Sequence, residues 1–419
     1  MSTSREFYDL LTVDDASQAL LKSISRLTQT EEVPLLAALG RIVAAEITAR
    51  ADIPGFARST VDGYAIRAKD SFGASQSIPG LFTVIGGVRM GEVNTLTIGA
   101  GEAVEVPTGG MLPAGADSVV MVEHVERTGE ILEVYEGVSP GENMVAPDED
   151  LRQGETILPL GSRVRAQDIG ALAACGITTV QVYRRLKVGL LSTGDEIVPI
   201  ETDPLKPGQI RDVNSWALAA NLNRLGCEVV LGGIMPDNFD QLVTAVQRLV
   251  DASDLVLISG GSSVGMRDHT IDVIEQLGSR RVIFHGVTIK PGKPTLAGVV
   301  DQVPVIGLPG HPASALVVYK VFVEPIIRYL QGEVEIHPRR ILRLPITRSL
   351  ASPAGREEYV RVRIVEQDDG FWADPVLGKS GLVSTLLRGQ ALARIPLGSE
   401  GVKAGELVEL LAWDEGEIR

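Results

Sequence analysis

The segment KVGLLSTGDE, residues 187–196, is an apolar run that ends on two hydroxyls, a glycine and two adjacent carboxylates. An apolar run of this length predicts a strand that is buried on both faces. Downstream segments alternate between amphipathic helices and further apolar strands, which predicts an α/β unit around a parallel sheet. The predicted helices are SWALAANLNRLG, NFDQLVTAVQRLVDA and ASALVVYKVFVEPIIRYLQG, and the predicted strands are CEVVLGGIM, DLVLISGG and VPVIGLPG.

This α/β unit is the centre of a predicted multidomain α/β plus β fold. Near the N-terminus, segments 17–29 and 36–49 carry apolar residues at helical spacing. Short β-rich stretches between Gly and Pro turns follow, and alternating stretches return near the C-terminus. The expected domains are a discontinuous helical and mixed domain (1–50 and 145–182), a β-rich domain (51–144), an α/β domain (183–332) and a C-terminal β-barrel (333–419).

Composition and charge exclude several classes of protein. The 419-residue chain has a net charge of −15, which argues against a general nucleic-acid binder because phosphate neutralisation needs clustered Lys and Arg. Its apolar runs are shorter than the ~20 residues that span a bilayer, and its N-terminus lacks a secretory signal pattern. Cys175 and Cys227 lie in apolar segments, which favours core thiols in a reducing compartment. We therefore expect a cytoplasmic protein without nucleic-acid or membrane partners.

Polar loops follow three of the predicted strands. Ligands of open α/β sheets bind beyond the carboxyl ends of the strands, and glycines let backbone N–H groups approach an anion closely. Each loop alone would also be explained as a plain turn, but together they predict a pocket for a phosphorylated ligand. The candidate residues are Thr193, Gly194 and Glu196 in the first loop, Ser259, Gly260, Gly261, Ser263 and Asp268 in the second, and Pro309, Gly310 and Ser314 in the third.

Charged residues near these loops suggest how an anion and a cation would be held. Lys290 and Lys293 flank a Pro-Gly pair and would bind oxyanions, although solvated lysines on a turn would look the same. Glu196, Asp237 and Asp268 follow strands, and Mg²⁺ prefers one or two carboxylates with substrate oxygens. We expect Glu196 and Asp268 to bind the metal. Capping of a helix would also explain Asp237.

The β-rich domain adds three further candidates. Asp62 lies in STVDGYA, Thr108 in the turn PTGG, and Asp150 in the acidic stretch PDEDLRQGE. A hairpin corner and a solvated acidic loop are the alternative interpretations of these stretches.

The order of the motifs is more specific than any one of them. STVDGYA, PTGGMLPAGADSVV, GENMVAPDEDLRQGE, STGDEI, GQIRDVNS, SGGSSVG, IKPGKP and GLPGHPASA occur in this sequence. In this order they closely resemble the MoeA family, the molybdopterin molybdenumtransferases that include the gephyrin E domain. The resemblance extends from about residue 51 to residue 332 and is weaker towards the C-terminus.

The resemblance implies an elongated four-domain homodimer. Its third domain, with a three-layer fold like that of MoaB and MogA, would bind molybdopterin, and the second domain of the other subunit would close the site. The reaction would convert adenylylated molybdopterin and molybdate into molybdenum cofactor and AMP with Mg²⁺. A molybdopterin adenylyltransferase and apo-molybdoenzymes would be partners. By position, Asp62, Asp150, Glu196, Asp237 and Asp268 match catalytic acids.

The remaining candidates match the substrate-binding loops of the family, and two of them belong to its last domain. GREEYVR and GLVSTLLRG resemble stretches that supply an arginine and a serine near molybdate, which implies Arg361 and Ser384. The residues matching the pterin, phosphate and oxyanion loops are Thr108, Thr193, Gly194, Ser259, Gly260, Gly261, Ser263, Lys290, Lys293, Pro309, Gly310 and Ser314.

Five positions depart from the family pattern. Val61 occupies the position where the family usually has Met, and Val145 and Ala146 occupy positions where it often has arginines. Gly286 replaces a lysine found in many members, and His311 replaces the Asn of GLPGNP. The lost positive charges leave alternatives open: a tungstate-inserting enzyme, or a paralogue that binds molybdopterin without inserting metal. A gephyrin-like scaffold is a third alternative.

Overall fold

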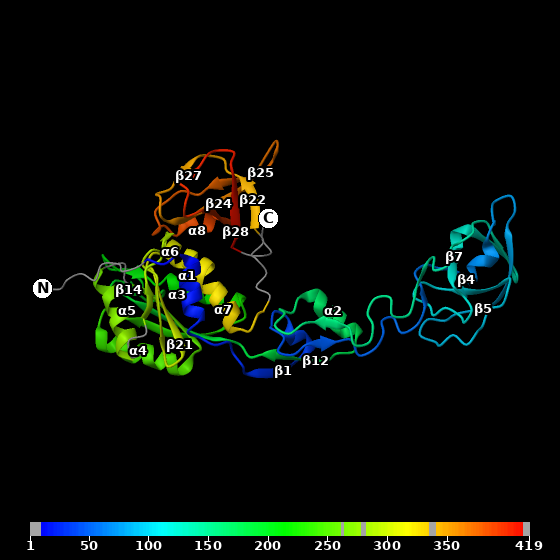
Figure 1. Ribbon diagram of the computed structural model, residues 1–419, viewed down its shortest axis with the longest axis horizontal. Coiled ribbons are helices and arrows are strands. Elements are labelled where there is room, and N and C mark those ends of the chain that lie inside the picture. The colour runs from blue at the N-terminus through cyan, green and yellow to red at the C-terminus, as the bar shows by residue number, and fades with distance from the viewer. Residues whose placement is uncertain (1–9, 261–263, 278–281, 335–340, 414–419) are drawn as a thin grey trace.

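The protein is elongated in the computed structural model, which describes residues 10–260, 264–277, 282–334 and 341–413, with the side chains of 264–268 and 341 left undescribed. The α/β unit and the C-terminal unit lie together at one end, and the β-rich unit lies at the other (Figure 1). The small helical and mixed unit connects them. None of the helices in the described ranges is both long and apolar enough to cross a bilayer.

The α/β unit is built on a six-stranded sheet with the order β16-β13-β17-β21-β20-β18. Its first four strands are parallel, and the last two are antiparallel to their neighbours. The strands are β13 (Lys187–Thr193), β16 (Glu228–Met235), β17 (Leu255–Gly260), β18 (Val282–His285), β20 (Leu296–Val300) and β21 (Val303–Leu308).

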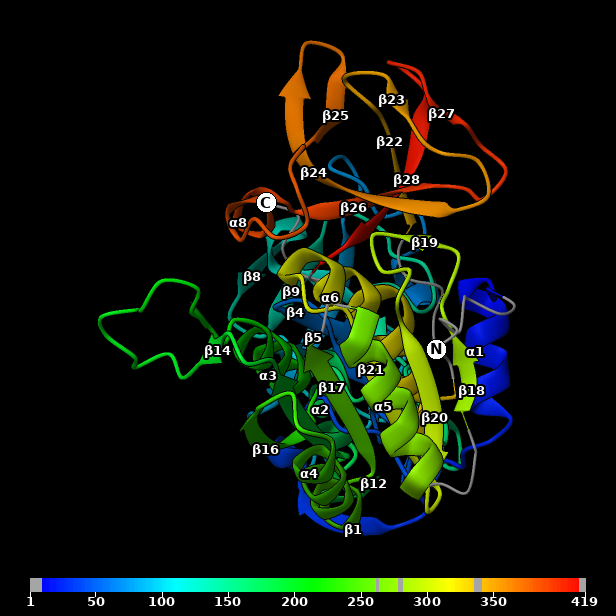
Figure 2. The ribbon, with the colours of Figure 1, turned by 90° about the vertical axis from the view of Figure 1, so that its left-hand side faces the viewer.

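Helices cover both faces of this sheet, as the apolar strands require. Leu190 of β13 packs in the core beneath one helical layer, and the adjacent Leu191 packs in the core beneath the other. Figure 2 shows α4 and α5 side by side on their face. One layer holds α1 (Val13–Leu21), α3 (Asn214–Arg224), α6 (Pro312–Val318), η4 (Tyr319–Val323) and α7 (Glu324–Leu330), and the other holds α4 (Phe239–Ala252) and α5 (Val264–Leu277).

The N-terminal fifty residues differ from the sequence-based expectation in two ways. Helix α1 packs in the α/β core through Val13, Ala16 and Leu20, rather than belonging to the helical and mixed unit. Periodicity predicted a helix over 17–29, whereas the helix begins at Val13 and ends at Leu21, and periodicity does not reveal which surface the apolar face covers. The helix predicted over 36–49 is wrong: only η1 (Leu35–Ala38) is helical there, and its Gly40 has a φ of 74° that interrupts a helix.

The other units form their own sheets and cores. The helical and mixed unit pairs β1 (Thr30–Pro34) with β12 (Thr179–Tyr183) and β2 (Ile47–Thr48) with β11 (Thr156–Leu158), beside α2 (Ala166–Ala174). The β-rich unit has the strand order β7-β4-β6-β5-β9-β8. Its elements are β3 (Arg58–Ser59), β4 (Gly63–Ile66), η2 (Ala68–Ser71), β5 (Gly80–Gly87), β6 (Glu102–Val106), β7 (Ser118–Met121), η3 (Val122–His124), β8 (Val125–Thr128), β9 (Ile131–Val134) and β10 (Met144–Val145).

The C-terminal unit is a curled sheet with the order β19-β24-β26-β28-β22, in which β25 also pairs with β24. Ile346, next to β22, forms a bridge with Ala373 of β25 and so brings the two edges together as in a barrel. The elements are β19 (Ile289–Lys290), β22 (Ile341–Pro345), β23 (Leu350–Ala351), β24 (Glu357–Gln367), β25 (Gly370–Pro375), α8 (Ser384–Arg388), β26 (Ala391–Ile395), β27 (Gly401–Val402) and β28 (Leu407–Ala412).

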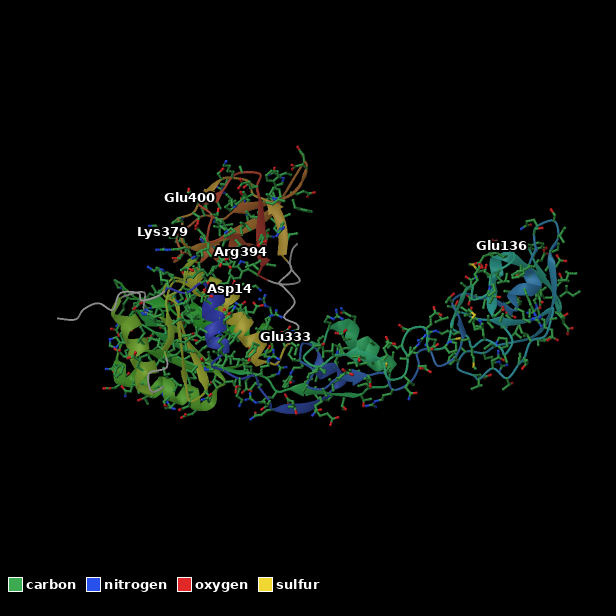
Figure 3. The ribbon with its side chains drawn as sticks, viewed as in Figure 1. Asp14, Glu136, Glu333, Lys379, Arg394 and Glu400 are labelled. Atoms are coloured by element: carbon green, nitrogen blue, oxygen red, sulfur yellow. The ribbon has the colours of Figure 1, made fainter. Side chains whose placement is uncertain are left out.

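A buried chain of ion pairs joins the α/β unit to the helical and mixed unit. Glu324 contacts Lys320 Nζ at 3.0 Å and Arg328 Nη2 at 3.0 Å. Glu333 contacts Arg328 Nη1 at 3.2 Å and Arg163 Nη2 at 2.7 Å. Figure 3 labels Glu333 at this junction. Each carboxylate lies between two cations, so both buried acids are compensated.

We expect Glu324→Gln to destabilise this junction strongly, because it leaves Lys320 and Arg328 buried beside a neutral partner. Breaking a buried ion pair costs roughly 3–5 kcal/mol, measurable as a lower urea midpoint. Glu228→Gln is the matched control: Glu228 pairs with Lys187 at 3.8 Å and both side chains are about half exposed, so a change below about 1 kcal/mol is expected. Equal effects of the two substitutions would contradict the interpretation.

Candidate functional site

The strand order reverses between β13 and β17, and a cavity opens at their carboxyl ends. From β13 the chain crosses through α3 to β16 on one side, whereas from β17 it crosses through α5 towards the other side. Such a reversal point is where open α/β sheets bind ligands. The cavity has a volume of about 420 Å³. It is lined by Ser192, Thr193, Glu196, Ile197, Leu205, Ile210, Arg211, Asp212, Val213, Asn214, Ser259, Gly260, Gly310, His311, Pro312, Gly381 and Val383.

The structure therefore brings together five of the predicted substrate-site residues. Thr193 ends β13 and Glu196 lies in the loop after it, Ser259 and Gly260 end β17, and Gly310 lies in the loop after β21. The loop between β14 (Ile197–Val198) and β15 (Ile210–Arg211) projects from the α/β unit (Figure 2), and its Leu205 lines the cavity. Three loops that are distant in sequence meet because parallel strands end at one edge of the sheet.

Acidic side chains gather on the β13 side. The Thr193 hydroxyl donates to Asp237 Oδ1 at 3.2 Å, and the Asp237 backbone N–H donates to Asp195 Oδ1 at 3.0 Å. Burial raises the pKa of Asp237, as do the negative charges of Asp195 and Glu196, while the Thr193 hydrogen bond opposes them. Gly194, between Thr193 and Asp195 in the sequence, has a φ of 147°. A Cβ at this position would lie 2.8 Å from Glu196 Oε2, so no other residue fits without strain.

This acidic group suits a hard cation only in part. Carboxylate oxygens that repel one another are stabilised by a divalent cation, and Mg²⁺ takes one or two carboxylates with other oxygens. Within the described ranges, no three His, Cys, Asp or Glu side chains form a complete ligand set. Glu196 and Asp237 can supply oxygens, and the side chain of Asp268, in α5, is outside the described part.

Asn214 is a central residue of the cavity that the sequence analysis did not single out. At the start of α3, its Nδ2 donates to Ser259 Oγ at 2.8 Å and to the Gly310 carbonyl at 2.8 Å. It thereby joins the loops after β17 and β21. Asn214 is buried, and the only signal for it was its place in the quoted motif GQIRDVNS.

The glycine at the end of β17 is required by packing. A Cβ on Gly260 would lie 2.2 Å from the carbonyl oxygen of Thr193, closer than any side chain tolerates. The close approach of the two strand ends therefore depends on this glycine. It also keeps backbone open to the cavity, as the prediction of an anion-binding loop requires.

The lysines and the last-domain residues lie at the border with the C-terminal unit. Neither Lys290 nor Lys293 is among the described lining residues, and Lys290 Nζ pairs with Glu358 Oε1 at 2.8 Å. Arg361 is buried, and its Nη2 donates to the Gly378 carbonyl at 3.0 Å. Burial lowers the pKa of this guanidinium. Ser384 is exposed at the start of α8, next to the lining residue Val383.

Three predicted residues lie far from this cavity, along the arm formed by the β-rich unit. Asp62 Oδ1 accepts from the Thr108 N–H at 2.8 Å and from the Thr108 hydroxyl at 3.0 Å. These hydrogen bonds, the backbone one foremost, lower the pKa of Asp62. Asp150 is exposed where the β-rich unit joins the helical and mixed unit. The β-rich unit lies at the opposite end of the chain from the α/β unit (Figure 1), so Asp62 and Thr108 do not reach the cavity of their own chain.

The remaining candidates are partly described. Ser314 is buried in the first turn of α6, after Pro309 and the lining residue Gly310. Gly261 and Ser263 lie outside the described residues, so their predicted roles stay predictions.

Family comparisons cover nearly the whole chain. The family described as MoeA N-terminal region (domain I and II) matches residues 11–176, the probable molybdopterin binding domain matches 189–329, and MoeA C-terminal region (domain IV) matches 343–413. The chain belongs to the MoeA family. The resemblance inferred from the eight motifs is therefore confirmed, together with the multidomain α/β plus β fold class.

Relatives of this MoeA protein match over at least nine-tenths of their lengths. A molybdopterin molybdenumtransferase from Haemophilus influenzae is 34% identical over 96% of this chain and 98% of its own. One from Bacillus subtilis is 33% identical over 91% and 90%. The crystal structure of a molybdopterin biosynthesis MoeA protein from Pyrococcus horikoshii has a TM-score of 0.84 at 32% identity, covering 97% of this chain and 100% of its own.

We expect Asp237→Asn to raise the melting temperature at pH 7. Because the pKa of Asp237 is raised in the folded state, its ionised form costs stability above its unfolded pKa of about 3.9, and that cost disappears in acid, where both states are protonated. The gain should therefore vanish near about pH 3 in calorimetric scans. Asp240→Asn in the first turn of α4 is the control, since an acid there is favourable and its loss should not stabilise. A lower melting temperature for Asp237→Asn at pH 7 would refute this.

Proposed function

We propose that this MoeA protein is a molybdopterin molybdenumtransferase that converts adenylylated molybdopterin and molybdate into molybdenum cofactor and AMP. The observation that carries the proposal is the cavity at the reversal point, where hydroxyls, backbone groups and carboxylates from three loops meet. Relatives named for this activity match over nearly their whole length. Molybdate is the proposed oxyanion, and tungstate is the alternative to be tested in the same assay.

The cavity residues suit the chemistry of AMP release. Cleavage of a phosphoanhydride concentrates negative charge on phosphate oxygens, and fixed hydrogen-bond donors stabilise that charge. Thr193, Ser259 and the backbone near Gly260 are placed to hold the phosphates, with Asn214 fixing two of the loops. Arg361 on β24, buried behind the loop that lines the cavity, would attract molybdate through its charge.

We further propose that Glu196 binds Mg²⁺ together with Asp268. Mg²⁺ bound there would neutralise the phosphate oxygens of the substrate and orient them. Burial is the main cause of the raised pKa of Asp237, and the negative charges of Asp195 and Glu196 add to it; these neighbouring carboxylates support a cation at this place. Asp237 itself positions Thr193 through the hydrogen bond between their side chains.

A second copy of the chain would complete the site. Asp62 precedes β4 and Thr108 follows β6 in the β-rich unit, which lies at the other end of the chain from the α/β unit (Figure 1). Beside that cavity is a larger groove of about 920 Å³, where Trp216 and Leu231 are 54% and 60% exposed. The arm exposes Val93 at 77%. Apolar surfaces of this kind mark interfaces, so we propose a homodimer in which the arm of one subunit reaches the cavity of the other.

The surroundings of the reaction follow from the proposed substrate. Both cysteines, Cys175 and Cys227, are free thiols, which agrees with a cytoplasmic location. We propose that a molybdopterin adenylyltransferase supplies the substrate and that apo-molybdoenzymes accept the product.

Glu196→Gln should abolish AMP release without unfolding the protein, because it removes a carboxylate at the proposed cation site. We expect kcat/KM to fall by roughly 100-fold or more, measured as AMP formed from adenylylated molybdopterin with Mg²⁺ and molybdate. Glu201→Gln is the control, since Glu201 is exposed and lines only the neighbouring groove. Full activity of Glu196→Gln would end the assignment.

A complementation experiment tests the shared site. Asp62→Asn and Glu196→Gln chains, each inactive alone, are co-expressed with different tags. Random pairing makes about half of the dimers mixed, and each mixed dimer has one intact site, so about a quarter of wild-type activity should return. If both residues acted within one chain, no activity would return.

A further inference from the structure

Part of the wall of the substrate cavity comes from the C-terminal unit, through the loop between β25 and α8 at residues 376–383. Gly381 and Val383 of this loop line the cavity together with the turn at residues 310–312 of the α/β unit. Figure 2 shows the C-terminal unit over the end of the α/β unit where α6 lies. The shape of the cavity therefore depends on how firmly the β25–α8 loop is held against the α/β unit.

Apolar packing does little to hold the β25–α8 loop. Leu377 and Leu382 are 59% and 49% exposed, and Val383 is 42% exposed. A segment with so few buried apolar contacts opens at a low free-energy cost unless polar contacts hold it. Arg361 supplies one such contact, because its Nη2 donates to the Gly378 carbonyl at 3.0 Å. That contact fixes the start of the loop and leaves its cavity-lining part to be held by other groups.

Ser380 connects the lining part of the loop to the start of α6. Its carbonyl accepts from the Ala313 N–H at 3.1 Å, and its hydroxyl lies 3.2 Å from Nδ1 of His311. A Cβ on Gly381 would lie 3.6 Å from Cδ2 of His311, which is ordinary van der Waals contact, so the imidazole also lies against the loop. His311 thus both lines the cavity and contacts the loop that forms part of its wall.

We propose that His311 is a positioning residue, which holds the β25–α8 loop against the substrate cavity through Ser380. The inference rests on the proposed function for the identity of the substrate, whereas the contact itself belongs to the fold. A displaced loop would weaken substrate binding, but it would leave in place the groups proposed to act on the phosphates. Loss of the contact should therefore raise KM and leave kcat nearly unchanged.

Two substitutions separate this role from direct contact between His311 and the substrate. In His311→Asn the amide takes the place of the Nδ1 side of the ring and can still form a hydrogen bond with Ser380. In His311→Gln the amide extends to the Nε2 side, and the contact with Ser380 is lost. We expect the KM for adenylylated molybdopterin to stay within about twofold in His311→Asn and to rise roughly three- to tenfold in His311→Gln, the effect of one hydrogen bond.

Hydrogen exchange of the substrate-free chain tests the contact without any reaction. The Leu382 and Thr385 amides donate to the carbonyls of Lys379 and Leu382, so their exchange reports opening of the loop. His311→Gln and Ser380→Ala should each speed this exchange by roughly threefold or more, and the double variant should be no faster than either one. Lys379→Gln is the control, because it alters an exposed side chain of the same loop (Figure 3) and leaves both contacts of Ser380 in place.

The combined results decide between the possibilities. Unchanged exchange in both His311→Gln and Ser380→Ala would overturn the proposal, as would additive effects in the double variant. Equal rises of KM in His311→Asn and His311→Gln would also overturn it, because the imidazole would then act without Ser380. His311 is exposed, and an unchanged melting temperature verifies that its variants are folded. A parent chain that shows the expected exchange pattern but releases no AMP would support the contact and count against the proposed function.

Discussion

The reversal of strand order between β13 and β17 is the constraint on which the rest of the α/β unit depends. It places the ends of two parallel strands side by side without a helix crossing between them. Gly260 allows the strand ends to approach, since a Cβ would collide with the Thr193 carbonyl. Asn214 then joins the second and third loops by two hydrogen bonds. The geometry of the cavity thus follows from sheet topology, one glycine and one buried amide.

Much of this site could be predicted from the sequence because its residues directly follow apolar strands. Thr193 and Ser259 lie at the ends of strands that are apolar almost throughout, and Glu196 follows the first of them. The carboxyl ends of parallel strands meet at one edge of the sheet. Asn214 could not be found in this way, since its importance comes from partners about 45 and 96 positions away. The ion pair between Lys290 and Glu358 could not be predicted for the same reason, because Glu358 lies on a distant strand of the C-terminal unit.

The limits of sequence patterns also appear in the fold. The apolar spacing over 17–29 predicts a helix near the observed α1, yet nothing in that spacing shows that the helix covers the α/β sheet rather than the unit next to it in sequence. Residues 36–49 have helical spacing, yet after η1 they are not helical, and Ile42 and Val43 form bridges with Arg163 and Val182. Tertiary pairing overrides local preference where a segment is short.

The β-rich unit is attached to the remainder by two neighbouring chain segments. Ile53 and Leu151 form an isolated bridge there, in which the Ile53 N–H donates to the Leu151 carbonyl at 2.8 Å. A two-stranded connection without further strands or a packed layer is only marginally stable by itself, so this link bends more easily than the units on either side of it. A small change of angle near Ile53 would therefore move Asp62 and Thr108 along a larger arc than residues close to the link, while their distance from the link stays nearly fixed.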